Sequence, residues 1–338
     1  MTTGWGRLAS LARWEVLLAT FLIVLIVIGT AVSPVFLTGR NFANLISAVI
    51  EVGIMSLPMA LIIIVGEIDL SVASILGLSS AMLGYLVLHD WPLGWAFVVV
   101  ILLGIAAGAF NGLLITRLGL PSLAVTIGTL TLYRGFAIVI LGPNIVSTFP
   151  ERYTSIGING VAGTFLSWSI VFFLILAVIF GVVLHVTPFG RSLFVMGLNK
   201  DAAIYAGIRV KRIKLLLFVV SGLICSFAGI LYTFRLSTAV QDNGLGLELN
   251  VVAIVLLGGV SIFGGRGTII GVALAVVVYA ALQNALFLTN FPPRAFGIVT
   301  GCLLLLSVLI PNAGSFYERA RAALARRRAR SRVALEAN

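Results

Sequence analysis

The amino-acid sequence predicts an all-α membrane protein with about ten transmembrane helices, and three observations lead to this fold class. First, 60% of the 338 residues are hydrophobic and only 10% are charged, whereas soluble domains carry about 25% charged residues. Second, the mean hydropathy is +1.17. Third, apolar runs such as Phe21 to Ile28 lack the alternation of a membrane β-barrel. Backbone groups left unpaired in lipid are costly, so these runs are expected to be helical.

Ten apolar stretches have roughly the length of about 20 residues that a bilayer-spanning helix requires. The first follows Arg7 and Arg13 and exceeds the apolar core of a signal peptide, so we interpret it as an uncleaved span. Glycine and polar residues interrupt the second and eighth. The connections are short, which predicts one membrane domain with an N-terminal segment at 1–14, a helical bundle at 15–311 and a basic tail at 312–338. The predicted spans are 15–35, 41–65, 71–88, 92–116, 121–141, 166–187, 212–235, 247–262, 267–289 and 294–311.

Basic residues are distributed unequally between the two sides that these spans define. With the N-terminus inside, the inner segments hold 17 Lys and Arg residues and the outer segments hold four, while Arg134 lies within a span. Positive charge accumulates on the cytoplasmic side of membrane proteins, so we expect both termini in the cytoplasm. Anionic lipid is the expected partner of the basic tail, and nucleic acid is not, because no basic fold accompanies the tail. The arginines of the tail are Arg319, Arg321, Arg326, Arg327, Arg328, Arg330 and Arg332.

The residues that commonly hold metals or form disulfides are scarce. Cys225 and Cys302 both fall inside apolar runs and resemble small buried hydrophobic residues. Only His89 and His185 are present as histidines. We therefore predict no metal site, no disulfide and no cofactor.

Two connections are longer than the others. The outer one, Gly142 to Phe165, is rich in Gly, Ser, Thr and Asn, and the inner one runs from Pro188 to Arg212. In the inner connection Asp201 can start a short helix, because an acidic residue is favoured at a helix N-terminus, and Gly207 suits its C-terminal cap. An ordinary connecting loop is the alternative. The candidate contact residues here are Gly197, Asn199, Asp201, Ala202, Ala203 and Gly207.

Two glycine-containing turns on the inner side are candidate elements of a gate. Gly66 to Leu70 predicts a tight turn in which Asp69 or Ser71 caps the following helix, whereas Glu67 has no such role. The second turn resembles a phosphate loop but lacks the Gly-Lys-Ser/Thr of that motif, so we predict no ATP hydrolysis by this chain. The candidate gate residues are Glu67, Asp69, Gly264, Gly265 and Arg266.

Four segments, in order, resemble the permease subunits of bacterial ABC importers for ribose, rhamnose, xylose and related sugars, including autoinducer importers. The segments are Gly66-Glu-Ile-Asp-Leu-Ser-Val-Ala-Ser74, Gly119-Leu-Pro-Ser-Leu-Ala-Val-Thr-Ile-Gly-Thr-Leu-Thr-Leu-Tyr-Arg-Gly135, Phe189-Gly-Arg-Ser192 with Gly197 to Gly207, and Leu257-Gly-Gly-Val-Ser-Ile-Phe-Gly-Gly-Arg-Gly267. The resemblance covers nearly the whole chain. It departs from the commonest family form at Glu67, where Gly is usual, which favours a rhamnose-type substrate without deciding it.

This resemblance implies a type II ABC importer-like permease in a bacterial inner membrane, not an enzyme. Asp201-Ala-Ala-Ile-Tyr-Ala-Gly207 is similar to the Glu-Ala-Ala-x-x-x-Gly loop by which importer permeases dock on an ATPase. The implied partners are a second permease subunit, identical or paralogous, a periplasmic sugar-binding protein and two ATP-binding subunits or one fused double ATPase. The 142–165 connection is the expected contact for the binding protein.

Several polar side chains fall at membrane depth, where each must face protein or water. We interpret most of them as helix-to-helix hydrogen-bonding groups, with contact to a transported sugar as the alternative. Arg134 is expected to pair with Glu51 or with Glu248, and the sequence leaves that choice open. The candidate pathway residues are Asn111, Arg134, Glu248, Asn250, Gln283 and Asn284.

Two other functions are compatible with a polytopic chain. A secondary transporter driven by an ion gradient would need embedded acids, and Glu51 or Glu248 could serve. An intramembrane hydrolase would need a Gly-x-Ser-x-Gly or His-Glu-x-x-His motif, and neither is present. Both alternatives are weaker than the importer reading.

Overall fold

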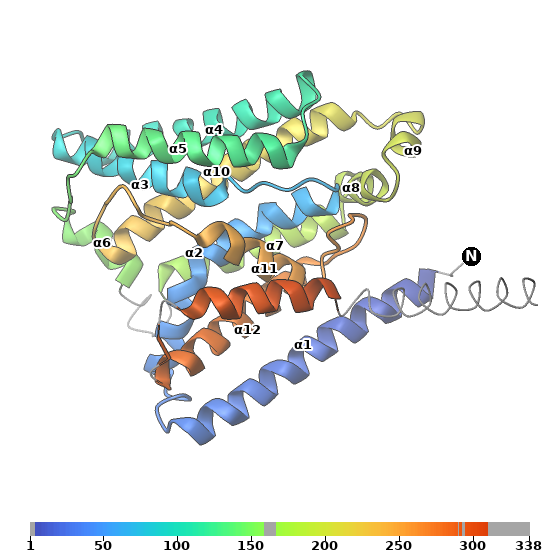
Figure 1. The fold of residues 1–338 in the computed structure, drawn as a ribbon, viewed down its shortest axis with the longest axis horizontal. Helices are drawn as coiled ribbons and strands as arrows, with labels where there is room; N and C mark the ends of the chain where they lie inside the picture. Colours follow the sequence, from blue (N-terminus) through green and yellow to red (C-terminus); the bar gives the residue numbers. More distant parts are fainter. Residues whose placement is uncertain (1–3, 159–166, 290, 293–294, 310–338) are drawn as a thin grey trace, which may run out of the picture.

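The computed structural model describes residues 4–158, 167–289, 291–292 and 295–309, with side chains from Trp14 onward (Figure 1). These residues form helices joined by turns, and the one β-type contact among them is an isolated bridge between Val146 and Ala239. The helices are α1 (Gly4–Val32), α2 (Gly39–Ile64), α3 (Val72–Leu88), α4 (Leu93–Arg117), α5 (Ser122–Leu141), α6 (Glu151–Ile158), α7 (Trp168–His185), α8 (Pro188–Leu198), α9 (Lys200–Tyr205), α10 (Val210–Leu236), α11 (Leu247–Leu257), α12 (Ile269–Leu288) and an unlabelled helix, Phe296–Leu309.

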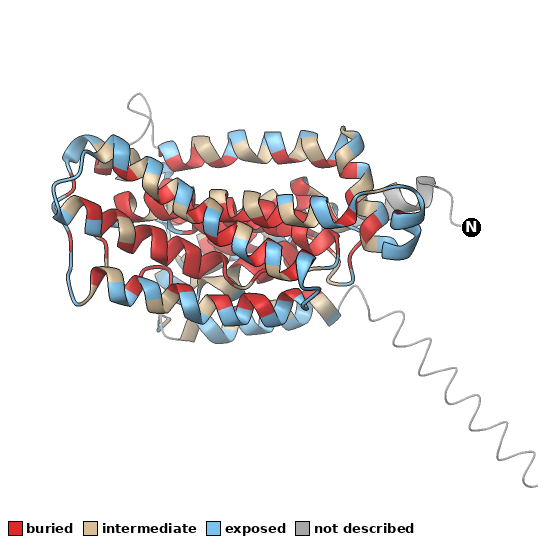
Figure 2. Cartoon of the chain, turned by 90° about the horizontal axis from the view of Figure 1, so that it is seen from above, coloured by how far each residue is buried: buried red, intermediate tan, exposed pale blue. Residues whose placement is uncertain are grey.

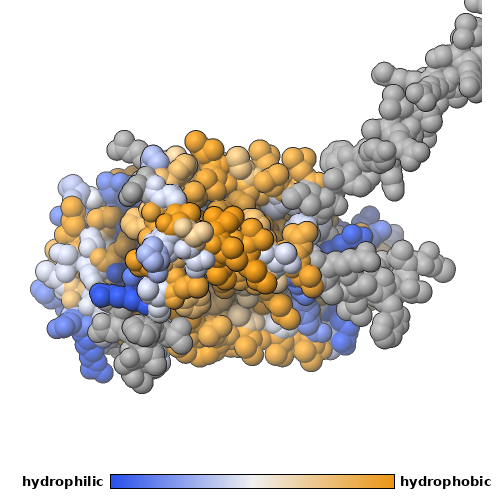
Figure 3. Space-filling view, turned by 90° about the horizontal axis from the view of Figure 1, so that it is seen from below, coloured by the Kyte–Doolittle hydropathy of each residue, from blue (hydrophilic) through white to orange (hydrophobic). Residues whose placement is uncertain are grey.

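The arrangement is that of a multi-pass membrane protein. Within the described ranges, seven helices are long and apolar enough to cross a bilayer: α2, α4, α5, α7, α10, α12 and the Trp14–Val32 part of α1. A broad apolar band lies between two more hydrophilic ends of the bundle (Figure 3). One end carries α8, α9 and the start of the chain, and the opposite end carries α6 (Figure 1). We call them the α9 end and the α6 end.

The helix α2 forms the centre of the bundle. Of its most apolar window 83% is buried, against 17% for α1, which lies along one side (Figures 1 and 2). It packs against α7, α10, α11 and α12, and every residue from Val49 to Ile64 is buried. The outer helices expose large apolar side chains instead, as at Val139 and Val178. In a bilayer these side chains would face lipid.

Glycine residues allow the helices α4 and α10 to pack closely against each other. Gly104, Gly108 and Gly112 occur at every fourth position, so they share one face of α4. A methyl group at Gly108 would overlap the carbonyl of Phe218, and one at Gly222 would overlap the carbonyl of Gly104. This backbone-to-backbone approach is typical of membrane helices, which lack a hydrophobic driving force between them.

Three predicted spans correspond to shorter helices, and one predicted loop is largely helical. The apolar helices α3, α11 and Phe296–Leu309 are each under 18 residues long. The eighth predicted span, 247–262, ends early because Gly258 and Gly259 begin a turn. The inner connection Pro188–Arg212 contains α8 and α9, and the outer one contains α6, which we did not predict. The remainder of that outer connection, 159–166, lies outside the described residues.

Candidate functional site

The two short helices at the α9 end begin and end at residues suited to those positions. Thr187 caps α8, because its hydroxyl accepts a hydrogen bond from Gly190 N–H at 3.2 Å, and Pro188 follows at the first helical position. Asn199 caps α9 by accepting from Ala202 N–H at 3.0 Å. Gly207 then stops the helix with φ of +80°. The prediction of a short helix that Gly207 terminates is therefore confirmed.

The helix α9 presents two different faces. Ala203 is fully buried and anchors it to the bundle. Asp201 and Tyr205, four residues apart, share one face, and Tyr205 is 92% exposed. Lys200 and Ile204 share another face, which lines a cavity. A large exposed aromatic side chain beyond the apolar band is typical of a protein-contact surface.

At Gly197, α8 meets two turns of the bundle in backbone-to-backbone contact. A methyl group added to Gly197 would overlap the carbonyl oxygen of Ile64, at the end of α2, and the amide nitrogen of Gly265. Gly265 N–H also donates to Ile64 O at 2.8 Å. Gly264 and Gly265 have φ of +80° and +71°, so glycine is required to form this turn. Arg266, beside this turn, is exposed.

An ion pair joins the α2–α3 connection to the beginning of α10. Glu67 accepts from the ammonium group of Lys214, and both side chains are largely buried. Gly66 has φ of +79° and lets the chain turn away from α2. Glu67 therefore holds two elements of the bundle together.

Asp69 lies inside the bundle, not at a surface turn. Its Oδ1 accepts from the amide and hydroxyl of Ser71 at 3.0 and 2.6 Å, and its Oδ2 accepts from the Ser221 hydroxyl at 3.0 Å. Ser221 is about 16 Å along α10 from Val210, at 1.5 Å per residue. Ser71 occupies the N-cap position of α3 and its hydroxyl makes no cap bond. The Asp69 carboxylate instead accepts the Ser71 amide at the start of that helix, so Asp69 is the one of the two predicted caps that the structure supports.

Asn111 and Asn284 join helices. Asn111 Nδ2 donates to Ser71 Oγ at 2.8 Å, and its Oδ1 lies 3.1 Å from the Tyr133 hydroxyl. Asn284 of α12 and Asn41 of α2 form a reciprocal amide pair with distances of 2.9 and 3.1 Å. These contacts favour the structural interpretation that we gave such residues over contact with a transported molecule.

Arg134 binds backbone carbonyls instead of a carboxylate at hydrogen-bonding distance. Its guanidinium donates to Asn243 O at 2.6 Å and to Ala73 O at 3.3 Å. Among the described residues neither Glu51 nor Glu248 forms an ion pair with Arg134, so neither predicted pairing is present. Arg134 thereby connects the first turn of α3 to the segment that precedes α11.

Glu51 pairs with Arg235, so the predicted alternative of a Glu51–Arg134 pair is wrong. Arg235 Nε donates to Glu51 Oε1 at 2.9 Å, and its guanidinium lies 5.1 Å from the centre of the Tyr232 ring. Arg235 was placed among the outer segments by the sequence, and at the last turn of α10 its side chain can still reach the buried acid on α2.

The remaining predicted pathway residues are half-buried. Glu248 and Asn250 occupy the first turn of α11, beside the exposed Leu245 and Leu249. Gln283 lies on α12 and lines a very small cavity with Phe296. Glu248 and Asn250 lie on the same helix but two positions apart, so they point to different sides, and Gln283 lies on another helix.

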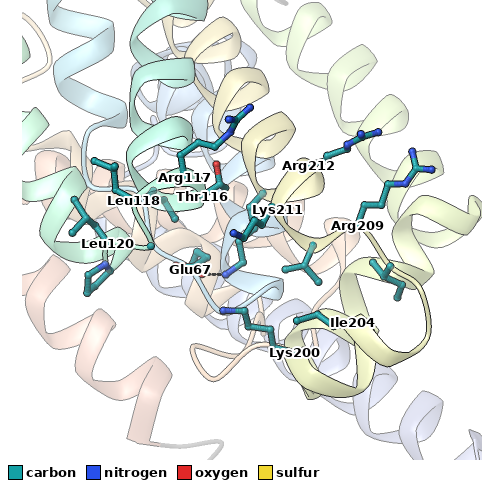
Figure 4. Close-up of a pocket in the computed structure, with 16 residues that line it drawn as sticks. Glu67, Thr116, Arg117, Leu118, Leu120, Lys200, Ile204, Arg209, Lys211 and Arg212 are labelled. Carbon is teal, nitrogen blue, oxygen red and sulfur yellow. Dashed lines mark hydrogen bonds and ion pairs between the residues drawn. The ribbon is translucent and has the colours of Figure 1, made fainter.

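A cavity of about 740 Å³ opens at the α9 end, between α9, the α4–α5 turn and the beginning of α10 (Figure 4). Sequence analysis did not find this cavity, because its walls come from three separate segments. Most of its basic residues are close together in the sequence, between 200 and 214, and folding adds Glu67 and Arg117 to them. The charged residues of the cavity are Glu67, Arg117, Lys200, Arg209, Lys211, Arg212 and Lys214.

Within the described residues, no group of three or more His, Cys, Asp or Glu side chains could hold a metal ion. Cys225 is buried and Cys302 is exposed, and both are free.

Comparison with known proteins identifies the class of protein to which this architecture belongs. Residues 41–308 match the family described as branched-chain amino acid transport system / permease component. Because the match covers well over half of the chain, the protein belongs to this family of membrane permeases.

Three relatives within this comparison are permeases of importers for sugars and autoinducer 2. The chain is 37% identical over 278 residues to the L-arabinose ABC transporter permease protein of Azospirillum brasilense, covering 82% of this chain and 81% of the relative. It is 34% identical over 292 residues to the ribose import permease protein of Bacillus subtilis, covering 86% and 90%. It is 33% identical over 303 residues to the autoinducer 2 import system permease protein of Klebsiella pneumoniae, covering 88% and 91%. No solved structure matches the chain.

Proposed function

We propose that this chain is the membrane-spanning subunit of an ATP-driven importer that carries a monosaccharide-class substrate into the cytoplasm. The observation that carries the proposal is the α8–α9 pair, which exposes Tyr205 beyond the apolar band and contacts the ends of α2 and the α11–α12 turn through Gly197. A surface for a soluble partner is thus connected directly to the central helix.

The α9 end is the cytoplasmic end in this proposal. The described basic residues at that end include Arg117, Arg191, Lys200, Arg209, Lys211, Arg212, Lys214 and Arg266, whereas Arg40, Arg152 and Arg235 lie toward the α6 end. This imbalance follows the positive-inside rule. We take the seven long and three short apolar helices as ten spans of a single membrane domain in a bacterial inner membrane, which would put the basic C-terminal tail in the cytoplasm.

Two ATP-binding subunits, or one fused double ATPase, would grip the Asp201 and Tyr205 face of α9. Movement of α9 carries α8 with it, because only Asn199 separates the two helices. Gly197 then transmits the movement to Ile64 and Gly265 without an intervening side chain. Coupling requires that the ATPase bind the two states of the permease with different affinity. ATP hydrolysis belongs to the partner.

A second permease subunit, identical or paralogous, would pack beside α11 and complete the pathway. The start of α11 supports this position, because it combines the exposed Leu245 and Leu249 with the half-buried Glu248 and Asn250. Polar groups beside exposed apolar ones at membrane depth need protein or water as a neighbour. A periplasmic sugar-binding protein would approach the α6 end.

The substrate class is taken from the named substrates of the relatives, which include arabinose, ribose and autoinducer 2. Glu67 is engaged by Lys214 at the α9 end, so we base no choice among sugars on the glutamate that stands where the family usually has glycine. We therefore propose the class of small polyhydroxylated molecule and no single sugar.

Reconstitution tests this function. The chain is placed in vesicles with the ATPase and binding-protein subunits of its own transport system, and uptake of labelled arabinose, ribose and rhamnose is measured. We expect uptake that requires both ATP and the binding protein. Uptake driven by a proton or sodium gradient without ATP would overturn the proposal in favour of a secondary transporter.

A further inference from the structure

The cavity at the α9 end is strongly basic, and most of its positive charge is not balanced by acidic side chains. Six lysine and arginine side chains surround it, with Glu67 as the one acid among its lining residues. Glu67 is already engaged by Lys214. Among the described residues, none of the other five basic side chains forms an ion pair, so the cavity keeps a net positive charge. In Figure 4, Lys200, Lys211 and Glu67 lie near the centre of the view, with Arg117, Arg209 and Arg212 around them.

The cavity is also amphipathic. Leu118 and Leu120, on the α4–α5 turn, are 66% and 44% exposed and form part of its wall. The turn continues into α5, where Leu123 and Ile127 are exposed along the side of the bundle. An apolar path therefore runs from the basic cavity to the surface that lipid covers.

We propose that this cavity binds the phosphate headgroup of one anionic phospholipid, whose acyl chains follow Leu118, Leu120 and the exposed side of α5. Basic pockets at the cytoplasmic boundary of membrane helices bind anionic headgroups, and a volume of about 740 Å³ is within the range of ligand sites. The location at the headgroup level rests on the proposed orientation, with the α9 end in the cytoplasm.

Lipid fits this cavity better than a segment of the ATPase does. The ATPase is expected on the Asp201 and Tyr205 face of α9, while the cavity is lined by Lys200 and Ile204. The two pairs occupy different faces of a helix of six residues. An ATPase and a lipid can therefore bind α9 at the same time.

The position of the site predicts that the lipid regulates coupling. Its walls are α9, the Glu67 segment and the beginning of α10, so a bound phosphate would draw together the parts that must move as one. We expect anionic lipid to increase ATP-driven uptake without being consumed or transported.

Binding is measured directly by titrating the detergent-solubilised full chain with phosphatidylglycerol and counting retained lipids by native mass spectrometry. Each basic residue near an anionic lipid contributes about fivefold in affinity, so Lys211→Gln should weaken binding roughly fivefold and Lys200→Gln/Lys211→Gln roughly 25-fold. Lys211→Arg should retain binding because it keeps the charge. The matched control is Arg191→Gln, which removes an exposed charge from α8 outside the cavity and should leave binding unchanged.

Two further measurements distinguish a lipid headgroup from free phosphate and from a segment of the ATPase. Inorganic phosphate at matched concentration should not displace the lipid, and equal displacement would make the site one for a soluble anion. Prior binding of the ATPase subunit should also leave the lipid in place. Loss of the lipid on ATPase binding would assign the cavity to the ATPase. Equal lipid affinity of Lys211→Gln and the unmodified chain would likewise overturn the proposal.

The functional consequence is tested in the complete transporter. Uptake is compared in vesicles of phosphatidylcholine alone and of equal parts phosphatidylcholine and phosphatidylglycerol. We expect the anionic lipid to raise uptake several-fold for the unmodified chain and not for Lys200→Gln/Lys211→Gln. Lipid binding without transport of any sugar would contradict the proposed function and leave the lipid site standing, whereas transport that is insensitive to anionic lipid would contradict its regulatory role.

Discussion

The helices α8 and α9 are adjacent in sequence but have opposite surroundings. Around Gly197, α8 touches the backbone of two other elements and has no space for one more methyl group. On α9, Tyr205 is almost fully exposed. The difference teaches how the proposed coupling would be divided within the pair: α9 would offer a surface to a partner, and α8 would transmit its movement to the bundle. Changes to α8 should therefore act on movement, and changes to the outer face of α9 should act on partner affinity.

The largest expected effect comes from removing α9 itself. Proline at Gly207 cannot adopt φ of +80° and loses the hydrogen bond from Gly207 N–H to Ile204 O at 2.9 Å. We expect Gly207→Pro to abolish uptake while membrane insertion is retained. Gly207→Asn should keep most uptake, because asparagine tolerates the left-handed conformation. Unchanged uptake by the proline variant would contradict the role of α9.

Charge reversal in Asp201→Lys, at the first turn of α9, is expected to lower uptake as severely as Gly207→Pro.

The second-largest expected effect comes from the backbone contact of Gly197 with Ile64 and Gly265. Overpacking costs about 1–3 kcal/mol, so Gly197→Ala should lower the rate of uptake by roughly 5- to 150-fold. The matched control is Gly181→Ala on α7, where an added methyl group meets open space. The control should transport normally. Binding of the ATPase to both variants, measured with labelled subunits, should remain near that of the unmodified chain. Equal uptake by the two variants would show that the contact at Gly197 does not transmit movement.

A smaller effect is expected from the exposed face of α9 that carries Tyr205. Tyr205→Ser should weaken ATPase binding by roughly 30-fold, because an aromatic residue at an interface hot spot contributes about 2 kcal/mol. Thermal stability should not change, since the side chain is exposed. Ile145→Ser is the control, as Ile145 is 72% exposed and follows α5 toward the other end of the bundle. If the two variants bind the ATPase equally well, the partner uses another surface.

The smallest effect concerns the ion pair that joins the α2–α3 connection to α10. Glu67→Gln leaves Lys214 without its partner and should lower uptake about two- to fivefold, between the contributions of exposed and buried pairs. A double-mutant cycle with Lys214→Gln measures the coupling. Additive effects of the two substitutions would show that the pair contributes nothing to transport.

The sequence predicted the helical membrane fold because twenty-residue apolar runs leave few alternatives. It also predicted α9 and its end at Gly207, where local residue types determine the conformation. The depth of Asp69 could not be predicted, because its partner Ser221 is 152 positions away. The basic cavity was missed for the same reason, since Arg117, Lys200 and Lys211 converge only after α4, α9 and α10 pack. The choice of Arg235 for Glu51 likewise depends on helix packing and side-chain reach, which the spacing of charges does not reveal.

The contacts of Arg134 have a consequence for how the two ends of the molecule communicate. A single guanidinium group holds Ala73, at the start of a helix entered from the α9 end, and Asn243, in a segment entered from the α6 end. A shift of either carbonyl by more than a fraction of an ångström must stretch or break one of these bonds. The arginine therefore ties the first turn of α3 to the segment before α11, so any movement of one relative to the other has to break or rearrange one of these two hydrogen bonds.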